Sequence, residues 1–178
     1  MNASPADTET GAAALAQRLL EERARRYARQ EQDGDAGEVQ DLLFFQQGDS
    51  RYALPLGALR EVRVLRGFCP IPGARAAVPG IFYSRGEVLS LHDLSAYMTG
   101  RRVQDARWVI IVEWKRQRLG ILAQDVIDVR NTPMSALRPP PITLGERGVT
   151  VQGAVGEALL LRVEALFSTP AFFHGLRG

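Results

Sequence analysis

Few side chains in this 178-residue sequence combine the types and the spacing that catalysis needs. His92 and Asp93 are adjacent, and a histidine with a carboxylate can act as a general base. Neighbouring residues of a strand point to opposite faces, however, and a base also needs a nucleophile within reach. We therefore predict that His92 is a surface residue at the end of a strand.

The single cysteine also lacks partners for chemistry. Cys69 has no second thiol with which to form a disulfide or build a zinc site, and its neighbours Phe68 and Pro70 indicate an apolar filler or an exposed loop residue. The sequence contains no G-x-S-x-G, no glycine loop for phosphate and no convincing carboxylate pair. We expect a protein that is not an enzyme and uses neither a metal nor a cofactor.

The most informative pattern is an internal repeat. Residues 41–63 align without a gap onto residues 108–130, at an offset of 67. A second echo, at an offset of 70, places residues 86–91 over residues 156–161. The repeat predicts two similar β units with a groove between them.

The elements that position these residues are mostly short strands. Apolar, β-branched and aromatic residues separated by turn signals predict strands at 42–46, 52–54, 61–65, 81–83, 88–91, 108–114, 119–122, 126–129, 149–151 and 158–161. Short helices are predicted at 93–99, where Gly100 is placed to end the helix, and at 163–167.

Residues 11–32 have a different pattern. Leu15, Leu19 and Tyr27 recur at helical spacing, so a helix with a thin, Ala-rich apolar stripe is predicted. A polar, glycine-containing break at 32–37 follows, which indicates an appendage that is dispensable for folding. The two interpretations of this arm are a solvated helix and a docking helix for a partner.

Composition limits the classes of function. The net charge is +2, and the arginines are scattered without interleaved aromatic residues, so no nucleic-acid partner is expected. The longest apolar runs are too short to cross a bilayer, and residues 1–40 do not have the pattern of a secretory signal. A cytoplasmic protein without membrane insertion is therefore expected.

The order of short motifs over residues 41–168 resembles the CheW-like domain of bacterial chemotaxis proteins. No single motif is specific, but their order and spacing are. The stretches that carry the resemblance are, in chain order, Leu43 to Gln46, Tyr52-Ala53-Leu54-Pro55, Glu61-Val62, Pro70-Ile71-Pro72-Gly73-Ala74, Gly80-Ile81, Arg85-Gly86-Glu87-Val88-Leu89, Asp93-Leu94, Gly120-Ile121 to Val129, and Gly153-Ala154-Val155-Gly156 to Leu166.

The resemblance implies a mainly β fold of two tandem five-stranded SH3-like barrels with short helices and an N-terminal helical extension. The expected divisions are residues 1–39 for the extension and linker, 40–170 for the CheW-like domain, and 171–178 for a C-terminal tail. Within the domain, lobes are expected at about 40–100 and 101–170. The expected core residues are Phe44, Tyr52, Leu54, Ile81, Leu89 and Leu91 for the first lobe, and Ile111, Leu119, Ile121, Val126, Leu159 and Leu161 for the second.

The family also implies a function and partners. It predicts a non-catalytic adaptor that couples methyl-accepting chemotaxis receptors, through their cytoplasmic helical tips, to the regulatory domain of a CheA-type histidine kinase. Such an adaptor is expected in the cytoplasm, recruited to receptor arrays at the inner membrane. The alternatives are an adaptor for gliding, pilus motility or another non-flagellar output, and a nucleic-acid-binding protein built on small barrels.

Site residues follow from the same resemblance. Glu61 and Arg85 match a pair that forms a salt bridge beside the receptor-binding groove, and a guanidinium suits a carboxylate geometrically. The expected sets are Glu61, Arg85, Leu59, Val62 and Val88 for the receptor groove, and Val64, Leu65, Phe68 and Ile71 for the kinase-binding face.

Two positions depart from the family pattern. Tyr83 stands where an asparagine is usual, and Gln124 where an aspartate is usual. Each change removes a short side chain that often serves a turn, so altered loops are expected there, and Tyr83 is expected to retune a partner surface.

Overall fold

The computed structural model describes Glu21 and residues 38–173 of the chain. The predicted helix at 11–32 lies, except for Glu21, outside the described residues, as do residues 174–178 of the expected tail. Among the residues described, no helix has the length and apolar character needed to cross a membrane.

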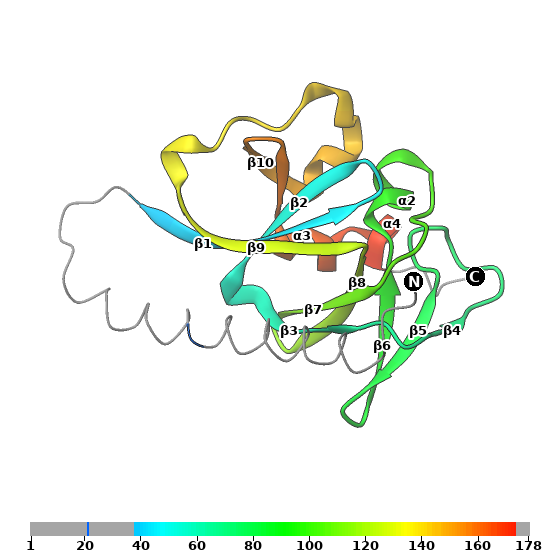
Figure 1. Cartoon of the computed structure of the whole chain (residues 1–178). Coiled ribbons are helices and arrows are strands. Elements are labelled where there is room, and N and C mark those ends of the chain that lie inside the picture. Colours follow the sequence, from blue (N-terminus) through cyan, green and yellow to red (C-terminus); the bar gives the residue numbers. More distant parts are fainter. Residues whose placement is uncertain (1–20, 22–37, 174–178) are drawn as a thin grey trace, which may run out of the picture.

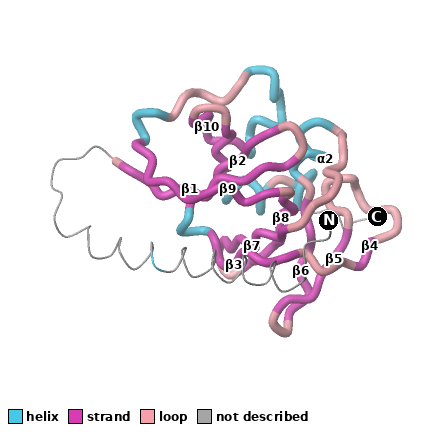
Figure 2. The backbone as a smooth tube through the Cα atoms, in the orientation of Figure 1, coloured by secondary structure: helices cyan, strands magenta, loops and turns pink. Residues whose placement is uncertain are grey.

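Strands are the most frequent elements of the described chain, as Figures 1 and 2 show. They are β1 (Val39–Gln47), β2 (Ser50–Pro55), β3 (Leu59–Val64), β4 (Cys69–Pro70), β5 (Gly80–Ser84), β6 (Glu87–His92), β7 (Trp108–Trp114), β8 (Gln117–Ala123), β9 (Asp125–Pro133), β10 (Val151–Val155) and β11 (Ala158–Leu161). The α-helices are α2 (Leu94–Thr99), α3 (Val163–Ser168) and α4 (Pro170–Phe173), and the 3₁₀ helices are η1 (Leu56–Ala58), η2 (Met134–Ala136) and η3 (Ile142–Thr150). The strand expected at 149–151 begins only at Val151, because Val149 and Thr150 belong to η3.

The strands form two sheets with the same internal order. One runs β10-β11-β2-β1-β9 and the other β3-β7-β8-β6-β5-β4. The repeat makes β1, β2, β9, β10 and β11 equivalent to β7, β8, β3, β5 and β6, and under this equivalence the two orders coincide. The one parallel pair of each sheet, β11 with β2 and β6 with β8, also corresponds. The expected fold class, mainly β with two small barrels, is confirmed.

The expected boundary between the lobes is wrong. Each sheet takes strands from both halves of the sequence, so residues 40–100 and 101–170 do not form separate barrels. Because duplicated halves supply equivalent strands, β3 pairs with β7 of the second half and β9 pairs with β1 of the first. The chain crosses from one sheet to the other through η1 and again between β8 and β9.

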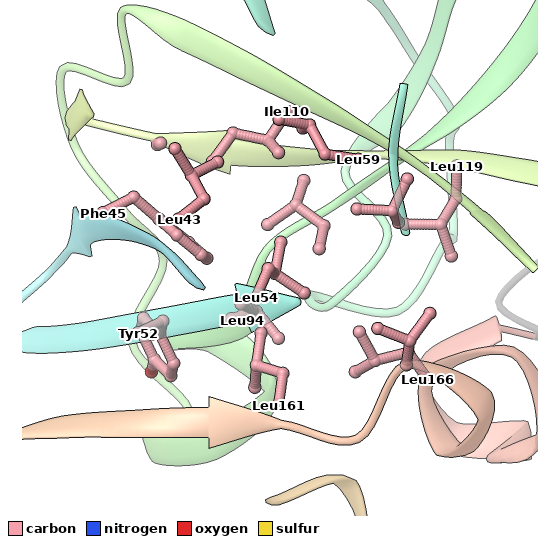
Figure 3. Close-up of a cluster of buried hydrophobic side chains, with 14 of the residues drawn as sticks. Leu43, Phe45, Tyr52, Leu54, Leu59, Leu94, Ile110, Leu119, Leu161 and Leu166 are labelled. Atoms are coloured by element: carbon pink, nitrogen blue, oxygen red, sulfur yellow. The ribbon is translucent and has the colours of Figure 1, made fainter. Parts of the chain in front are cut away.

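The largest core lies where the two sheets face each other (Figure 3). Leu43 and Phe45 of β1 point into it, whereas Leu42 and Phe44 point into a smaller cluster on the other face, as strand alternation requires. The residues that Figure 3 labels are Leu43, Phe45, Tyr52, Leu54, Leu59, Leu94, Ile110, Leu119, Leu161 and Leu166.

This shared core corrects the expected grouping of core residues. Tyr52 and Leu119, expected in different lobes, belong to one cluster. Leu89 and Leu91 likewise pack with Ile111, in a cluster of the second sheet. Ten of the twelve expected core residues are buried, and the exceptions, Ile81 and Leu159, are half-buried.

Helix α2 begins and ends where its capping residues predict. The Asp93 carboxylate accepts a hydrogen bond from the Ala96 backbone N–H at 2.9 Å, which satisfies a donor at the start of the helix. Gly100 ends the helix in the left-handed conformation, with a φ of 78°.

The surface location predicted for His92 is wrong. Its side chain is buried, because α4 returns from the end of the domain and places Phe172 against the imidazole, with 4.6 Å between the ring centroids. Nε2 of His92 lies 2.8 Å from Oγ of Ser90. Cys69, by contrast, is exposed on β4.

Candidate partner-binding surface

The β5–β6 hairpin presents an ion pair at its turn. Arg85 and Gly86 have φ values of 46° and 87°, the positive pair expected of a two-residue type I′ turn. Nε of Arg85 donates to Oε2 of Glu61 at 2.9 Å, and Nη2 donates to Oε1 at 3.4 Å. Hydrogen bonding and charge from Glu61 raise the pKa of Arg85. The ion pair expected from the resemblance is therefore present.

A second contact joins the same two strands. Arg63 of β3 donates to Oγ of Ser84 at 3.0 Å, beside the Glu61–Arg85 pair. In the sheet order, β3 and β5 lie at opposite ends, with only β4 beyond β5. These side chains bring the two ends together and close the barrel, so the surface around Glu61 contains residues from both.

Two exposed apolar side chains lie beside the ion pair. Tyr83 and Val88 are directly opposite each other in the hairpin, and paired residues of an antiparallel ladder point to the same face. Tyr83 is 68% exposed and Val88 is 64% exposed. We call Glu61, Arg85, Tyr83 and Val88 the hairpin surface. The hairpin pairing is regular at Tyr83, so the altered loop expected there is not seen.

Leu59 and Val62, expected in the receptor groove, are buried in the shared core. Both lie on β3, where a register shift between Leu59 and Glu61 breaks the alternation and lets residues three apart face inward. They lie in the core on the same strand as Glu61 and offer no surface to a partner. The expectation that they line the receptor groove is therefore wrong.

The residues expected for the kinase-binding face lie along the end of β3 and the segment after it. Phe68 is 40% exposed, whereas Val64, Leu65 and Ile71 are half-buried. Phe68 packs over Gly80, where an added Cβ would meet the Cys69 carbonyl oxygen at 2.3 Å. Glycine is therefore required at position 80 for this segment to reach β5.

A row of charges that the sequence did not reveal crosses four strands. Glu113 of β7 accepts from Arg60 of β3 and from Arg118 of β8, and Arg118 also pairs with Glu87 of β6 at 3.0 Å. Hydrogen bonds from Arg60 and Arg118 lower the pKa of Glu113. Only Glu113 and Arg118, which flank the predicted turn between β7 and β8, are close enough in sequence for a pattern to suggest them.

Gln124, the second departure from the family pattern, ties together two loops. Its Oε1 accepts from the Gly48 backbone N–H at 2.7 Å, and its Nε2 donates to the Gln104 carbonyl at 2.9 Å. The longer side chain therefore makes the backbone contacts of a turn residue by reaching across to the β1–β2 turn.

A groove of about 580 Å³ lies elsewhere, between the two sheets. None of the residues predicted for the receptor groove lines it. Its lining residues, which define the inter-sheet groove, are Gln40, Asp41, Pro55, Gly57, Ala58, Glu113, Trp114, Gln152, Leu161, Arg162, Val163 and Glu164. In the part of the chain that the structure describes, no three His, Cys, Asp or Glu side chains are grouped as a metal site would require.

Two small barrels with an exposed ion pair and neighbouring apolar side chains define a protein suited to contacts with other proteins. The family model of the CheW-like domain matches residues 41–171, and the chain belongs to this family.

Individual relatives agree with this membership. The chain is 32% identical over 103 residues to "Chemotaxis protein CheW" of Rhizobium meliloti (strain 1021), a match that covers 57% of the chain and 66% of that relative, just under two thirds of its length. It is 30% identical over 139 residues to "Probable chemotaxis protein CheW" of Rhizobium etli, covering 72% and 87% respectively. It is also 26% identical over 105 residues to "Protein FrzA" of Myxococcus xanthus, covering 58% and 66%.

A solved structure supports the fold. The crystal structure of the scaffolding protein TtCheW from Thermoanaerobacter tengcongensis superposes with a TM-score of 0.64 at 23% identity, covering 75% of this chain and 96% of that one.

Proposed function

We propose that this chain is a non-catalytic chemotaxis adaptor, which couples methyl-accepting chemoreceptors to the regulatory domain of a CheA-type histidine kinase. Its place would be the cytoplasm, at receptor arrays on the inner membrane. The mechanism is positional, because an adaptor that contacts receptor and kinase together can shift the kinase between states through differential contacts.

The observation that carries the proposal is the Glu61–Arg85 ion pair in a chain of this family. The pair joins β3 to the β5–β6 hairpin beside exposed Tyr83 and Val88. An interface of this kind combines apolar contact area with charged groups that fix orientation. We assign the receptor tip to the hairpin surface.

The kinase regulatory domain is assigned to a second surface. Phe68 is exposed, and the half-buried Val64, Leu65 and Ile71 lie close to it in the sequence, at the end of β3 and in the segment that follows. The two surfaces belong to the same barrel, but different residues carry them, so substitutions can separate the two partners.

The test is a pull-down of the purified full chain with kinase regulatory domains and receptor cytoplasmic fragments from the same genome. We expect binding to one kinase domain and to at least one receptor fragment. Failure to bind any kinase regulatory domain encoded there would overturn the proposal.

A second candidate is an adaptor of a non-flagellar chemosensory system. One of the relatives is named FrzA and not CheW, and the similarity to it is the observation that favours this second candidate. Binding to a kinase and receptors encoded beside motility genes other than those for flagella would identify this case.

Salt titration distinguishes a protein partner from a nucleic-acid partner. Affinity for nucleic acid falls steeply as the salt concentration rises, whereas the affinity of a protein interface with an apolar centre changes little.

A further inference from the structure

The inter-sheet groove lies at a place where the two halves of the repeat differ in structure. In the first half, Oε1 of Gln47 accepts from the Leu94 backbone N–H at 3.1 Å and Nε2 donates to Asp93, which closes the start of α2. The repeat places Trp114 at the position of Gln47. Helix α3 has Arg162 as its N-cap, with no side-chain cap. The start of α3 therefore opens onto a groove with an indole on its wall.

The groove offers both apolar contacts and negative charge. Pro55, Ala58 and Trp114, which are half-buried, supply apolar surface, whereas Leu161 and Val163 are buried behind it. Three carboxylates, Asp41, Glu113 and Glu164, also line it, against one guanidinium, Arg162. Glu113 is already engaged by Arg60 and Arg118, and Asp41 accepts from Asn131. The carboxylate placed for a further cation is Glu164, in the first turn of α3.

The chain itself enters at the rim of this groove. The Met134 backbone N–H donates to the Glu38 carbonyl at 2.8 Å, which fixes the entry point two residues before Gln40. Residues 33–37, the polar break, span at most about 18 Å when extended. The preceding segment is therefore confined close to the groove, and tethering of this kind gives effective concentrations on the order of millimolar.

The sequence of that segment matches the groove in chemistry. Residues 11–32 contain five arginines and three glutamates, together with Leu15, Leu19 and Tyr27 at helical spacing. The thin, Ala-rich stripe suits a narrow groove, because small side chains let a helix approach closely. Arginine also binds both a carboxylate and the face of an indole.

We propose that residues 11–32 of this same chain dock in the inter-sheet groove. Their apolar side chains contact the wall of Pro55 and Ala58, and their arginines contact Glu164 and Trp114. The docked segment covers a surface separate from the hairpin surface, so this inference does not depend on the proposed function.

Fluorescence of Trp114 tests the docking in the full chain. The sequence has two tryptophans, so Trp108→Phe leaves Trp114 as the only one. In that background, Leu19→Asp and Glu164→Arg should each raise the acrylamide quenching constant of Trp114 by about two-fold or more, as expected when a tethered cover is released. Glu146→Arg, an exposed acid outside the groove with the same change of charge, should leave the constant unchanged.

Hydrogen exchange of the chain with both tryptophans gives an independent measurement. Amides at 161–164 should exchange faster in Leu19→Asp than in the parent chain. Quenching and exchange that are equal in the parent, Leu19→Asp and Glu164→Arg would overturn the proposal. The proposal would also be overturned if protection of Trp114 and of the amides at 161–164 rose with protein concentration and was the same in Leu19→Asp. That result would indicate a second copy of the chain as the occupant.

Discussion

The rings of His92 and Phe172 lie 4.6 Å apart, which joins the end of β6 to the last helix described. Phe172 also meets Tyr97 of α2 edge-on at 5.4 Å between centroids. Burial lowers the pKa of His92 to about 3, against the opposing effect of a hydrogen bond with the Phe172 backbone. The imidazole is therefore neutral in the folded protein, and the contact holds α4 against both β6 and α2.

Acid should weaken the fold through His92. In the unfolded chain the imidazole titrates near 6.5, and in the folded chain near 3, so its contribution is complete above 6.5 and is lost as the pH falls through this window. Between pH 7 and pH 5 the free energy of unfolding should fall by about 2 kcal/mol. Burial raises the pKa of Asp93, whose effect on the pH dependence has the opposite sign.

Urea unfolding at pH 7, 6 and 5 measures this dependence. His92→Gln, which keeps a polar side chain but cannot titrate, should flatten the profile in this range. The matched control is His174→Gln, the same change at the other histidine of the sequence, which should leave the slope as it is. If the free energy of unfolding changed equally with pH in the parent and in His92→Gln, the pH dependence would not come from His92.

Phe172→Ala should lower the free energy of unfolding by about 3 kcal/mol, since it removes a fully buried aromatic side chain from the shared core. For a domain of this size the melting temperature should drop by roughly 6 to 12 °C. Ile142→Ala removes another large apolar side chain, which is 98% exposed, and should leave the melting temperature nearly unchanged. Calorimetry of both variants distinguishes the buried contact from a general loss of apolar area.

The β7–β8 turn should be improvable. Lys115 and Arg116 have φ values of 47° and 66°, a left-handed conformation that ordinary side chains adopt at a cost of about 1 kcal/mol or more each. Replacing them by Asn-Gly, the preferred pair for a type I′ turn, should raise the free energy of unfolding by about 1 kcal/mol. The gain is limited by loss of the Lys115 contact over the Trp114 ring, at 5.7 Å.

The β10–β11 turn, in the other sheet, provides the opposite control. Gly156 has a φ of 59°, and an added Cβ would meet no atom within 4 Å, so Gly156→Ala tests backbone strain alone. It should lower the free energy of unfolding by about 1 kcal/mol. Thermal unfolding of Gly156→Ala and of the Asn-Gly variant of the β7–β8 turn measures both effects. A shift of the two melting temperatures in the same direction would show that backbone strain does not decide the stability of these turns.

The sequence allowed the strands, the repeat and the capped helix α2 to be predicted because those features are local. Alternation separates the two faces of β1, both of which are buried, so Leu43 and Phe45 could be told apart from Leu42 and Phe44 in principle. Alternation does not say which strand is the neighbour, and in a duplicated chain β3 has two equivalent partners. The exchange of strands between barrels was therefore missed.

Burial by distant residues was missed for the same reason. His92 follows a strand and looks like a strand end, and only the return of α4 with Phe172 buries it. The Glu61–Arg85 pair was expected only through the family resemblance, because residues so far apart in the chain share no local pattern. In the structure the two side chains are 2.9 Å apart at their closest atoms, and a role of this pair in receptor binding is a proposal.

Charge reversal at the hairpin tests that role. Arg85→Glu places two carboxylates together and should weaken receptor binding by about tenfold, while Glu61→Arg with Arg85→Glu restores opposite charges and should recover part of the loss. Kinase binding should change much less, because we assign that contact to Phe68 and its neighbours. The matched control is the exposed Arg51–Glu157 pair of the other sheet, 3.2 Å apart, where Arg51→Glu should affect neither partner. Titration of the parent and the three variants against a receptor fragment and the kinase regulatory domain gives the eight affinities to compare. A double variant no better than Arg85→Glu, or an equal loss in Arg51→Glu, would show that the ion pair does not orient the receptor.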